Sequence, residues 1–365
     1  MIQYDYLIVG AGFYGSTFAR LVTDVGKKCL IIDKRNHIGG NAYDENIDGI
    51  NVHKYGPHIF HTNDDDIWDF VNRFSRFNNF VLTPKALTNG RIYSLPFNMH
   101  TFNELWNCIN PKQAKEIIDS QRFRGTPTNL EEQALSLVGT DIYELLIRGY
   151  TEKQWNKSCK NLPAFIIKRL PLRFTYNNNY FDDRYQGIPI DGYSKLFDNL
   201  LKGIHKICNV DYFDDVDNWN SQAKRIVYTG QIDQFFNYEF GDLQYRSLEF
   251  KTEMLFDTDN YQGIAQMNFP DFTVPYTRII EHKHFNNAKT NFTIITKEYS
   301  KNYHRGCVPY YPINDDTNTE IYKKYREKAN SLKNVIFGGR LGRYQYYNMD
   351  QVIGMAMKAV KEELI

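Results

Sequence analysis

The N-terminal segment carries glycines at the spacing that binds a diphosphate. Gly10, Gly12 and Gly15 follow the apolar run 6–9 and precede a stretch with helical apolar spacing, 16–25. In such a pattern the first glycine makes a tight turn, the second lets the backbone approach a pyrophosphate, and the third lets helix and strand pack closely. The N–H groups and dipole of the helix N-terminus attract the anion. The segment predicts a dinucleotide-binding turn, the alternative being a glycine turn without a ligand.

Two features after this turn select the dinucleotide. The apolar run 29–32 ends in Asp33, 21 residues after Gly12, where a carboxylate would accept hydrogen bonds from a ribose hydroxyl. Gly39 and Gly40 then form a second glycine turn. This pair resembles a flavoprotein pattern, in which backbone N–H groups reach the phosphates and ribitol of FAD. FAD is therefore the predicted cofactor.

Three histidines, His53, His58 and His61, follow the glycine turns at short spacing. No acidic or cysteine partner stands at ligand spacing, so we expect no metal site. We interpret these histidines as polar residues that line the edge of the flavin and are held by hydrogen bonds.

A stretch rich in cations, prolines and asparagines covers 166–180 and includes Arg169. Such a composition is typical of a flexible loop, and its arginine could grip an anion as part of a lid. A solvated basic loop is the alternative. The segments 275–278 and 309–312 add further aromatic side chains and a cation.

Length, charge and cysteine usage exclude several classes. The chain has 365 residues, enough for two or three subdomains, and a net charge of +1, which gives no bulk attraction to nucleic acid or membrane. Its five scattered cysteines form no CxxC motif and indicate a reducing compartment. No apolar run approaches the ~18 residues of a membrane span, and the N-terminus lacks a leader pattern. We therefore expect a cytoplasmic protein.

Hydrophobic periodicity places these motifs on elements. A hairpin is predicted over 81–95 with Asn89-Gly90 as its turn, and a small helical bundle from about 101 to 150. Alternating segments predict strands of a mixed or antiparallel sheet, forming a substrate floor, at 225–228, 247–255 and 292–297. A late strand, a glycine pair and a closing helix, from 334 onward, would return the chain to the cofactor. The dinucleotide-binding domain is therefore predicted to be discontinuous.

Several longer motifs occur together in the chain, namely HIGGNAY, YGPHIFHT, GYTEKQW, NNNYF, RYQGIP, PYTRIIEHK, PYYP and GGRLGRYQYYNMD. In these motifs the chain resembles, nearly from end to end, the bacterial UDP-galactopyranose mutase family, to which dTDP-fucopyranose mutase is closely related. The resemblance implies an α/β fold made of three parts. These are a Rossmann-like FAD-binding domain (1–80, 205–240 and 312–365), an inserted helical bundle (98–165), and a twisted antiparallel sheet with a mobile lid (81–97, 166–204 and 241–311).

The resemblance also implies the activity, an isomerase that interconverts the pyranose and furanose forms of a nucleotide-diphosphate hexose without net redox change. Reduced FAD would be the nucleophile, attacking the anomeric carbon through N5 to form a covalent sugar–flavin adduct. An external reductant for FAD, a homodimer and a furanose product for a surface polysaccharide such as O-antigen are implied as well. An FAD-dependent oxidase or dehydrogenase is the alternative, and it does not explain two diphosphate-binding arginines.

The family's motifs assign roles to individual positions. Arg169 and Arg278 would bind the diphosphate and stabilise the charge that develops as it leaves. Tyr150 would stack on the nucleobase, and Trp155 would close the pocket beside the sugar. Hydroxyl groups would come from Tyr180, Tyr311 and Tyr346, and Asn177 would lie on the lid. Glu298 and the catalytic candidate His61 would lie near flavin and sugar. The implied cofactor contacts are Gly10, Gly12, Phe13, Gly15, Asp33, Lys34, Gly39, Gly40, Asn41, His58, Ile59, Gly339, Arg340, Asn348 and Met349.

Two positions depart from the family's pattern. Leu82 stands where relatives tend to place a polar residue that can face the sugar, and Asn348 stands where they usually carry an aspartate. Loss of polar partners relaxes the rejection of a sugar that lacks a hydroxyl. The two residues therefore suggest a 6-deoxy hexose, as in dTDP-fucopyranose. Neutral drift in an enzyme acting on UDP-galactopyranose is the alternative.

Overall fold

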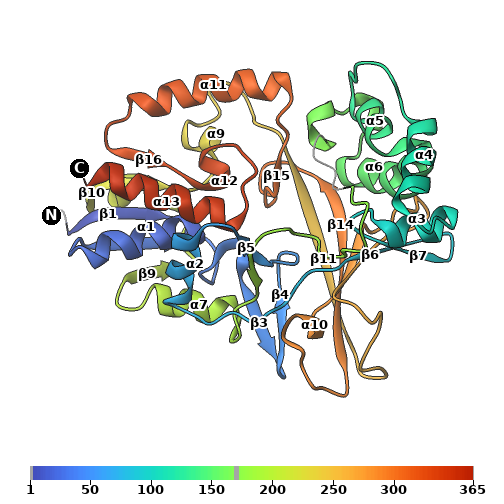
Figure 1. Cartoon of the computed structure of the whole chain (residues 1–365). Coiled ribbons are helices and arrows are strands. Elements are labelled where there is room, and N and C mark those ends of the chain that lie inside the picture. Colours follow the sequence, from blue (N-terminus) through green and yellow to red (C-terminus); the bar gives the residue numbers. More distant parts are fainter. Residues whose placement is uncertain (1–2, 168–171, 365) are drawn as a thin grey trace.

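The described part of the chain, residues 3–167 and 172–364 of a computed structural model, is made of two main sheets and a group of helices. Figure 1 shows the two chain ends beside one sheet, the helical group on the opposite side, and long twisted strands between them. The described helices are all too short or too polar to cross a bilayer.

The N-terminal strand lies at the centre of a parallel sheet. β1 (Tyr4–Val9) pairs in parallel with β2 (Cys29–Asp33) and with β10 (Ala223–Tyr228), and β9 (His205–Cys208) and β16 (Val335–Phe337) complete the order β16-β10-β1-β2-β9. Continuous apolar runs suit these strands because both faces of the sheet are covered. Segments from both ends of the chain meet here, so the dinucleotide-binding half is discontinuous, as predicted.

Helices cover the two faces of this sheet. α1 (Phe13–Asp24), α7 (Gly192–Leu200) and α13 (Met349–Glu363) share a core cluster with Ile8 of β1. The next residue along β1, Leu7, points to the opposite face, because side chains alternate along a strand. There it packs in a second cluster with Tyr325 of α11 (Asp316–Ser331).

Two segments lie elsewhere than the sequence predicts. The stretch 225–228, whose alternating pattern predicts a strand of the substrate sheet, belongs to β10 of the parallel sheet, since Ile226, Val227 and Tyr228 are buried between its two helical layers. This location agrees with the family resemblance, which assigns 205–240 to the FAD-binding domain. α7 packs in the core of the same half, although the predicted sheet and lid extend to residue 204. In both cases the packing of apolar residues on the parallel sheet decides the location. The remaining domain boundaries stay predictions.

A second, mostly antiparallel sheet connects this half to the helices. Its order is β15-β11-β14-β13-β12-β6-β7, and Figure 1 shows its two long strands crossing the middle of the molecule. The strands are β15 (Tyr311–Pro312), β11 (Tyr245–Leu255), β14 (Thr293–Asn302), β13 (Arg278–Glu281), β12 (Gln266–Asn268), β6 (Lys85–Thr88) and β7 (Arg91–Ser94). Asn89 and Gly90, both with positive φ, make the predicted hairpin turn between β6 and β7.

The helical group begins after that hairpin. It consists of α3 (Met99–Trp106), α4 (Pro111–Gln121), α5 (Leu130–Ile142), the π-helical turn η2 (Tyr143–Arg148) and α6 (Gly149–Trp155). Asn129 caps α5, accepting a hydrogen bond of 3.0 Å from the backbone N–H of Glu132. Gly139, with φ 78°, makes a break within α5.

Shorter elements connect these parts. They are β3 (Asp44–Ile47), β4 (Ile50–His53), β5 (Phe60–Thr62), β8 (Tyr185–Gly187), α2 (Asp65–Asn72), α8 (Val216–Ser221), α9 (Ile232–Phe235), α10 (Lys283–Asn286), α12 (Gly339–Gly342) and the 3-10 turns η1 (Gly40–Ala42), η3 (Cys159–Asn161), η4 (Ala164–Ile167) and η5 (Tyr212–Asp214).

Candidate functional site

A cavity opens at the carboxyl ends of the parallel strands, where the two glycine turns meet. A Cβ atom added to Gly15 would lie 2.1 Å from the carbonyl oxygen of Gly10, so only glycine allows α1 to pack on the turn. A Cβ atom on Gly40, whose φ is +58°, would lie 3.0 Å from the Cα of Gly12. The second turn therefore closes directly over the first, and both backbones line the cavity.

Asp33 is held at the end of β2 by backbone groups. Its Oδ2 accepts a hydrogen bond of 2.7 Å from the N–H of Ala11, and its Oδ1 accepts one of 2.9 Å from the N–H of Arg35. Each oxygen keeps a second lone pair. The carboxylate can therefore accept further hydrogen bonds from a ribose that enters the cavity.

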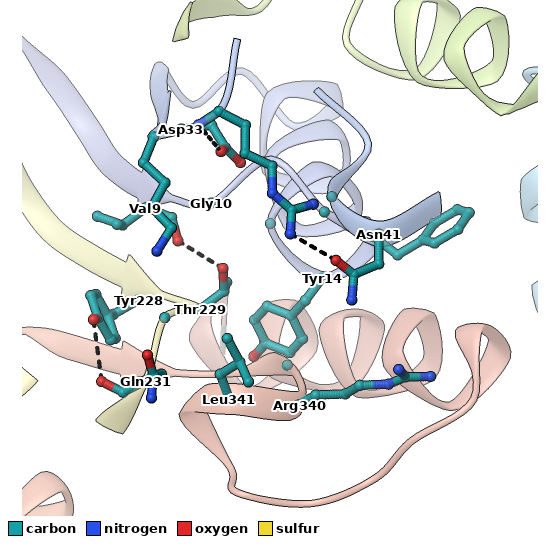
Figure 2. A pocket seen from close by; sticks show the side chains of 18 of the residues that line it. Val9, Gly10, Tyr14, Asp33, Asn41, Tyr228, Thr229, Gln231, Arg340 and Leu341 are labelled. Carbon is teal, nitrogen blue, oxygen red and sulfur yellow. Dashed lines mark hydrogen bonds between the residues drawn. The ribbon is translucent and has the colours of Figure 1, made fainter. Parts of the chain in front are cut away.

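Most of the predicted cofactor residues meet around this cavity. The lining includes Gly10, Gly12, Phe13, Gly15, Asp33, Lys34, Gly39, Gly40, Asn41, His58, Gly339, Arg340 and Met349. Figure 2 shows Asp33 and Asn41 on one side of the cavity and Leu341 and Arg340 on the other. Two predicted residues are placed differently. Ile59 is buried in the core cluster, and Asn348 is the N-cap of α13, its backbone N–H donating to the side chain of Gln351.

Sequence reasoning missed several lining residues. They are Arg35, the segment 210–213 after β9, the segment 229–231 after β10, and Tyr347. Thr229 shows why: its hydroxyl donates to the carbonyl oxygen of Val9 at 2.8 Å, beside the glycine turn (Figure 2). Residues after a parallel strand gather at one edge of a sheet. The polar stretch after each strand was the signal in the sequence. Only the strand order shows which of these stretches meet at the cavity.

The cavity fits a flavin dinucleotide by its unpaired polar atoms. Arg35 lines the cavity, and its Nη2 donates to the Oδ1 of Asn41 at 2.8 Å. Its guanidinium lies 4.2 Å from the centre of the Tyr55 ring. The Nη1 of Arg35 and the hydroxyl of Tyr14 are buried without a hydrogen-bond partner among the described residues. Buried polar atoms of this kind need partners. A ligand with phosphates and hydroxyls supplies them.

His58 forms part of the cavity wall as a neutral imidazole. Burial lowers its pKa to about 3. Its Nδ1 lies 2.8 Å from the carbonyl oxygen of Gly56, and only a protonated nitrogen can donate to a carbonyl. We therefore assign the proton to Nδ1, which leaves Nε2 as a hydrogen-bond acceptor.

A buried ion pair with tyrosines around it lies in the second sheet. The guanidinium of Arg278 in β13 lies 2.7 Å from the Oε2 of Glu298 in β14, whose side chain is fully buried. Burial raises the pKa of Tyr150 to about 12, and the positive charge of Arg278 acts against that rise. Burial and the nearby carboxylate of Glu298 raise the pKa of Tyr311 as well. Both phenols therefore stay protonated donors beside a fixed cation.

Arg340 connects this cluster to the cavity. Its guanidinium lies 4.4 Å from the centre of the Tyr346 ring, and its Nε donates to the carbonyl oxygen of Tyr347 at 2.6 Å. The ring of Tyr346 lies 5.5 Å from that of Tyr311. The structure thus brings Arg278, Glu298, Tyr150, Tyr311, Tyr346 and Arg340 together beside the cavity.

Two further predicted residues lie on the lid segment, and two others lie away from the cavity. Asn177 and Tyr180 are exposed, and the backbone N–H of Tyr180 donates to the carbonyl oxygen of Leu82 at 2.8 Å. His61 lies outside the cavity, stacked on Phe181 with its Nδ1 2.8 Å from the Oδ2 of Asp183. Trp155 lines a separate cavity with residues 312–316. Arg169 falls outside the described residues.

Leu82 is not oriented as the sequence predicts. Its side chain is only 4% exposed and belongs to the core cluster of the first half, so it does not face an open sugar site. An apolar side chain next to this cluster gains more by joining the core than by lining a polar cleft.

We expect Leu82→Asn to lower stability. The amide would enter an apolar cluster without a hydrogen-bond partner, which costs about 1–3 kcal/mol. Urea denaturation of the flavin-loaded protein measures the loss. Leu82→Met, which keeps apolar volume, should change the midpoint far less, and equal midpoints for Leu82→Asn and the unmodified chain would contradict the burial of this side chain.

In the described ranges, no three or more His, Cys, Asp or Glu side chains come together as potential metal ligands. His53 and His282 instead are buried and joined by a hydrogen bond, with the Nδ1 of His282 3.3 Å from the backbone N–H of His53. Burial lowers the pKa of His53 to about 3 and that of His282 well below its usual value.

This burial predicts a loss of stability in mild acid. Both pKa values are lower in the folded state, so the unfolded chain takes up the protons, and the stability present above pH ~6.5 falls as the pH decreases toward about 3. The slope should approach about 1.4 kcal/mol per pH unit for each histidine. Urea midpoints between pH 7 and 5 measure it. His53→Gln should reduce the slope, whereas His100→Gln at an exposed position should not; identical slopes for all three proteins would contradict the assignment.

Comparisons with known proteins agree with this arrangement. A family model described as UDP-galactopyranose mutase matches residues 145–346, and one described as an NAD(P)-binding Rossmann-like domain matches residues 8–74. The dTDP-fucopyranose mutase of Escherichia coli is 42% identical, over 97% of this chain and 97% of that protein. A probable UDP-galactopyranose mutase of Klebsiella pneumoniae is 39% identical, over 99% of this chain and 94% of that protein. A crystal structure of reduced UDP-galactopyranose mutase has the same fold, with a TM-score of 0.73 at 15% identity, covering 99% of this chain and 96% of that one.

Proposed function

The chain belongs to the UDP-galactopyranose mutase family, and on that premise we propose that it converts a nucleotide-diphosphate hexopyranose into the corresponding furanose. It is an isomerase with FAD as its cofactor. The match covers nearly the whole chain, so the alternative of an FAD-dependent oxidase or dehydrogenase is set aside. The observation that carries the proposal is the pair of Arg278 and Glu298 among tyrosines, beside the cavity that fits FAD.

The cation of this pair would bind the diphosphate. Glu298 holds Arg278 by contacts of 2.7 and 2.8 Å, so the guanidinium is oriented before a substrate arrives. A fixed positive charge stabilises a leaving diphosphate most when it needs no rearrangement. Tyr150 and Tyr311 would donate or stack from the same side. Arg169 on the lid segment is proposed as the second diphosphate ligand.

The residues of the cavity would hold and orient the cofactor. Reduced FAD, when bound, supplies the nucleophile of the reaction, and no side-chain nucleophile is then required. Asp33 would accept from the ribose, the glycine turns would meet the pyrophosphate, and Arg35 would pair its buried Nη1 with an acceptor on the ligand. His58 lines the same space.

Two nucleotide sugars are candidates for the substrate. Asn348 and the relative from E. coli favour dTDP-fucopyranose, whereas the second relative acts, by its description, on UDP-galactopyranose. The burial of Leu82 removes it as a direct sugar contact in this structure. Asn348 is an N-cap, a position that asparagine and aspartate fill equally well, which also explains their exchange without a change of substrate.

A product assay tests this function and separates the two sugars. Dithionite-reduced protein is given UDP-galactopyranose and dTDP-fucopyranose in parallel, and kcat/KM is compared. A preference for the fucose compound supports the deoxy-sugar hypothesis, and a preference for the galactose compound rejects it. If neither sugar changes ring size, the proposed function is wrong.

The cellular setting remains part of the same proposal. We propose a cytoplasmic homodimer whose FAD is reduced by an external donor and whose furanose product enters a surface polysaccharide such as O-antigen. These points rest on the family resemblance.

A further inference from the structure

One lysine ammonium in the helical group is surrounded by backbone carbonyls. The Nζ of Lys153 in α6 donates to the carbonyl oxygens of Phe269, Asp271, Val274 and Tyr276, at 2.5, 2.8, 2.9 and 3.1 Å. All four acceptors belong to one loop, 269–276, between β12 and β13. An ammonium has three N–H groups, so four carbonyls share them around a single point charge. The loop is thus folded around this cation.

A second contact seats the same face of α6 on the same loop. A Cβ atom added to Gly149 would lie 2.1 Å from the carbonyl oxygen of Pro270, so glycine alone lets the helix approach. Gly149 and Lys153 are four residues apart and lie on one helix face. The two contacts fix both the distance and the rotation of α6 over the loop. They thereby fix Tyr150 and Trp155, which the same helix carries.

The loop also leads directly into the strand that carries the diphosphate ligand. The carbonyl of Tyr276 accepts from Lys153, and Arg278 follows two residues later at the start of β13. Between them, the N–H of Thr277 donates to the carbonyl oxygen of Glu298 at 2.9 Å. A short, hydrogen-bonded path therefore joins the ammonium to the pair of Arg278 and Glu298.

We propose that Lys153 is a positioning residue of the substrate site: its ammonium sets the helix that carries Tyr150 and Trp155 at a fixed distance from Arg278. A nucleotide that stacks on the tyrosine and places its diphosphate on the arginine needs that distance to be constant. The inference rests on the proposed function, because it takes the roles of Tyr150 and Arg278 from it. Lys153 itself does not line the cavity that fits FAD.

The charge of Lys153 gives this role a pH dependence. Burial lowers its pKa to about 8, and the nearby carboxylate of Asp271 acts against that shift. Hydrogen bonds from Thr273 hold the pKa of Asp271 below its usual value, so this carboxylate stays charged. Tyr150, whose pKa is raised to about 12, does not titrate between pH 7 and 9. Above pH 8 the lysine becomes a neutral amine with fewer N–H groups for the four carbonyls.

The test measures nucleotide binding by calorimetry, with the flavin-loaded protein and its Lys153→Met and Lys153→Ala variants. UDP is the probe, and dTDP replaces it in every arm if the unmodified protein binds dTDP more tightly. We expect Kd for UDP to rise at least about tenfold in both variants, a loss of about 1.4 kcal/mol, because Tyr150 and Arg278 would no longer be held at the distance that one nucleotide spans. Flavin content should not change, and in turnover KM should rise more than kcat falls. Lys112→Met, at an exposed position of α4, is the matched control and should bind UDP normally.

Chemical rescue separates positioning from a general loss of structure. In Lys153→Ala, added ethylammonium can occupy the carbonyl cage and should restore UDP affinity, whereas tetramethylammonium, which has no N–H, should not. In the unmodified protein Kd should rise between pH 7 and 9, and in Lys153→Met it should be flat. Unchanged Kd in the variants, equal effects of the two ammonium salts, or a flat pH profile of the unmodified protein would overturn the inference. UDP binding is independent of ring contraction, so failure of the mutase activity would appear separately, as absence of furanose from the unmodified protein.

Discussion

Replacing Arg278 with methionine should lower kcat/KM by roughly two to three orders of magnitude, the loss typical of removing a preorganised group that stabilises transition-state charge. The guanidinium of Arg278 would bind the leaving diphosphate and stabilise its charge, so the loss of Arg278 should reduce kcat and not only substrate binding. FAD should remain bound, since Arg278 lies outside the cavity lining. Steady-state kinetics with the reduced protein and a flavin absorbance spectrum measure both quantities.

The same substitution should also destabilise the fold, and this second effect needs its own control. It leaves Glu298, fully buried, without its cation, which costs about 3–5 kcal/mol. The double variant Arg278→Met/Glu298→Gln removes the unpaired charge and should recover most of the stability without recovering turnover. If the double variant regained both, the activity loss would be a folding effect, and normal turnover of Arg278→Met would reject the assigned role.

A methyl group on Gly12 should weaken FAD binding strongly while leaving the apo fold intact. The φ of Gly12 is −76°, which any residue adopts, and an added Cβ atom would meet nothing closer than the Cα of Gly40 at 3.8 Å. The methyl group would occupy the space in which the pyrophosphate approaches the backbone. We expect FAD affinity to fall by roughly a hundredfold or more, a loss of about 3 kcal/mol, measured by flavin fluorescence during reconstitution of the apoprotein.

Two further alanine substitutions serve as controls for Gly12→Ala. Gly15→Ala would place its Cβ atom 2.1 Å from the carbonyl oxygen of Gly10, so it should reduce both FAD binding and the stability of the apoprotein. Gly354→Ala in α13, outside the cavity lining, should leave FAD affinity unchanged. Equal FAD affinity of Gly12→Ala and the unmodified protein would contradict the placement of the pyrophosphate at this turn.

The part of the site that is local in sequence could be predicted from it. The turn 10–15, Asp33 and the pair Gly39-Gly40 need only neighbouring residues to define their geometry, and the structure places all of them at one cavity. The segments 210–213 and 229–231 could not be found in the same way. They reach the cavity because β9 and β10 flank β2 and β1, and that strand order is a property of the whole sheet.

The orientation of individual side chains also could not be predicted from the sequence. Leu82 follows a plausible pattern for a sugar-facing position, yet it enters the core because an apolar cluster lies beside it. Lys153 shows the opposite case, a charged residue in a helix whose role becomes visible only when four carbonyls of a distant loop surround it. In both cases tertiary packing, which no local pattern encodes, decides what the side chain touches.

The proposed reaction changes the size of the sugar ring and uses reduced flavin without consuming it. The most direct measurement follows the flavin spectrum and the product ring size together, during anaerobic turnover of UDP-galactopyranose and dTDP-fucopyranose. We predict that furanose accumulates over many turnovers from at least one sugar, that the flavin stays reduced throughout, and that the oxidised protein forms no product. Oxidation of the flavin in proportion to product, or a product that differs from the substrate in oxidation state, would contradict the account.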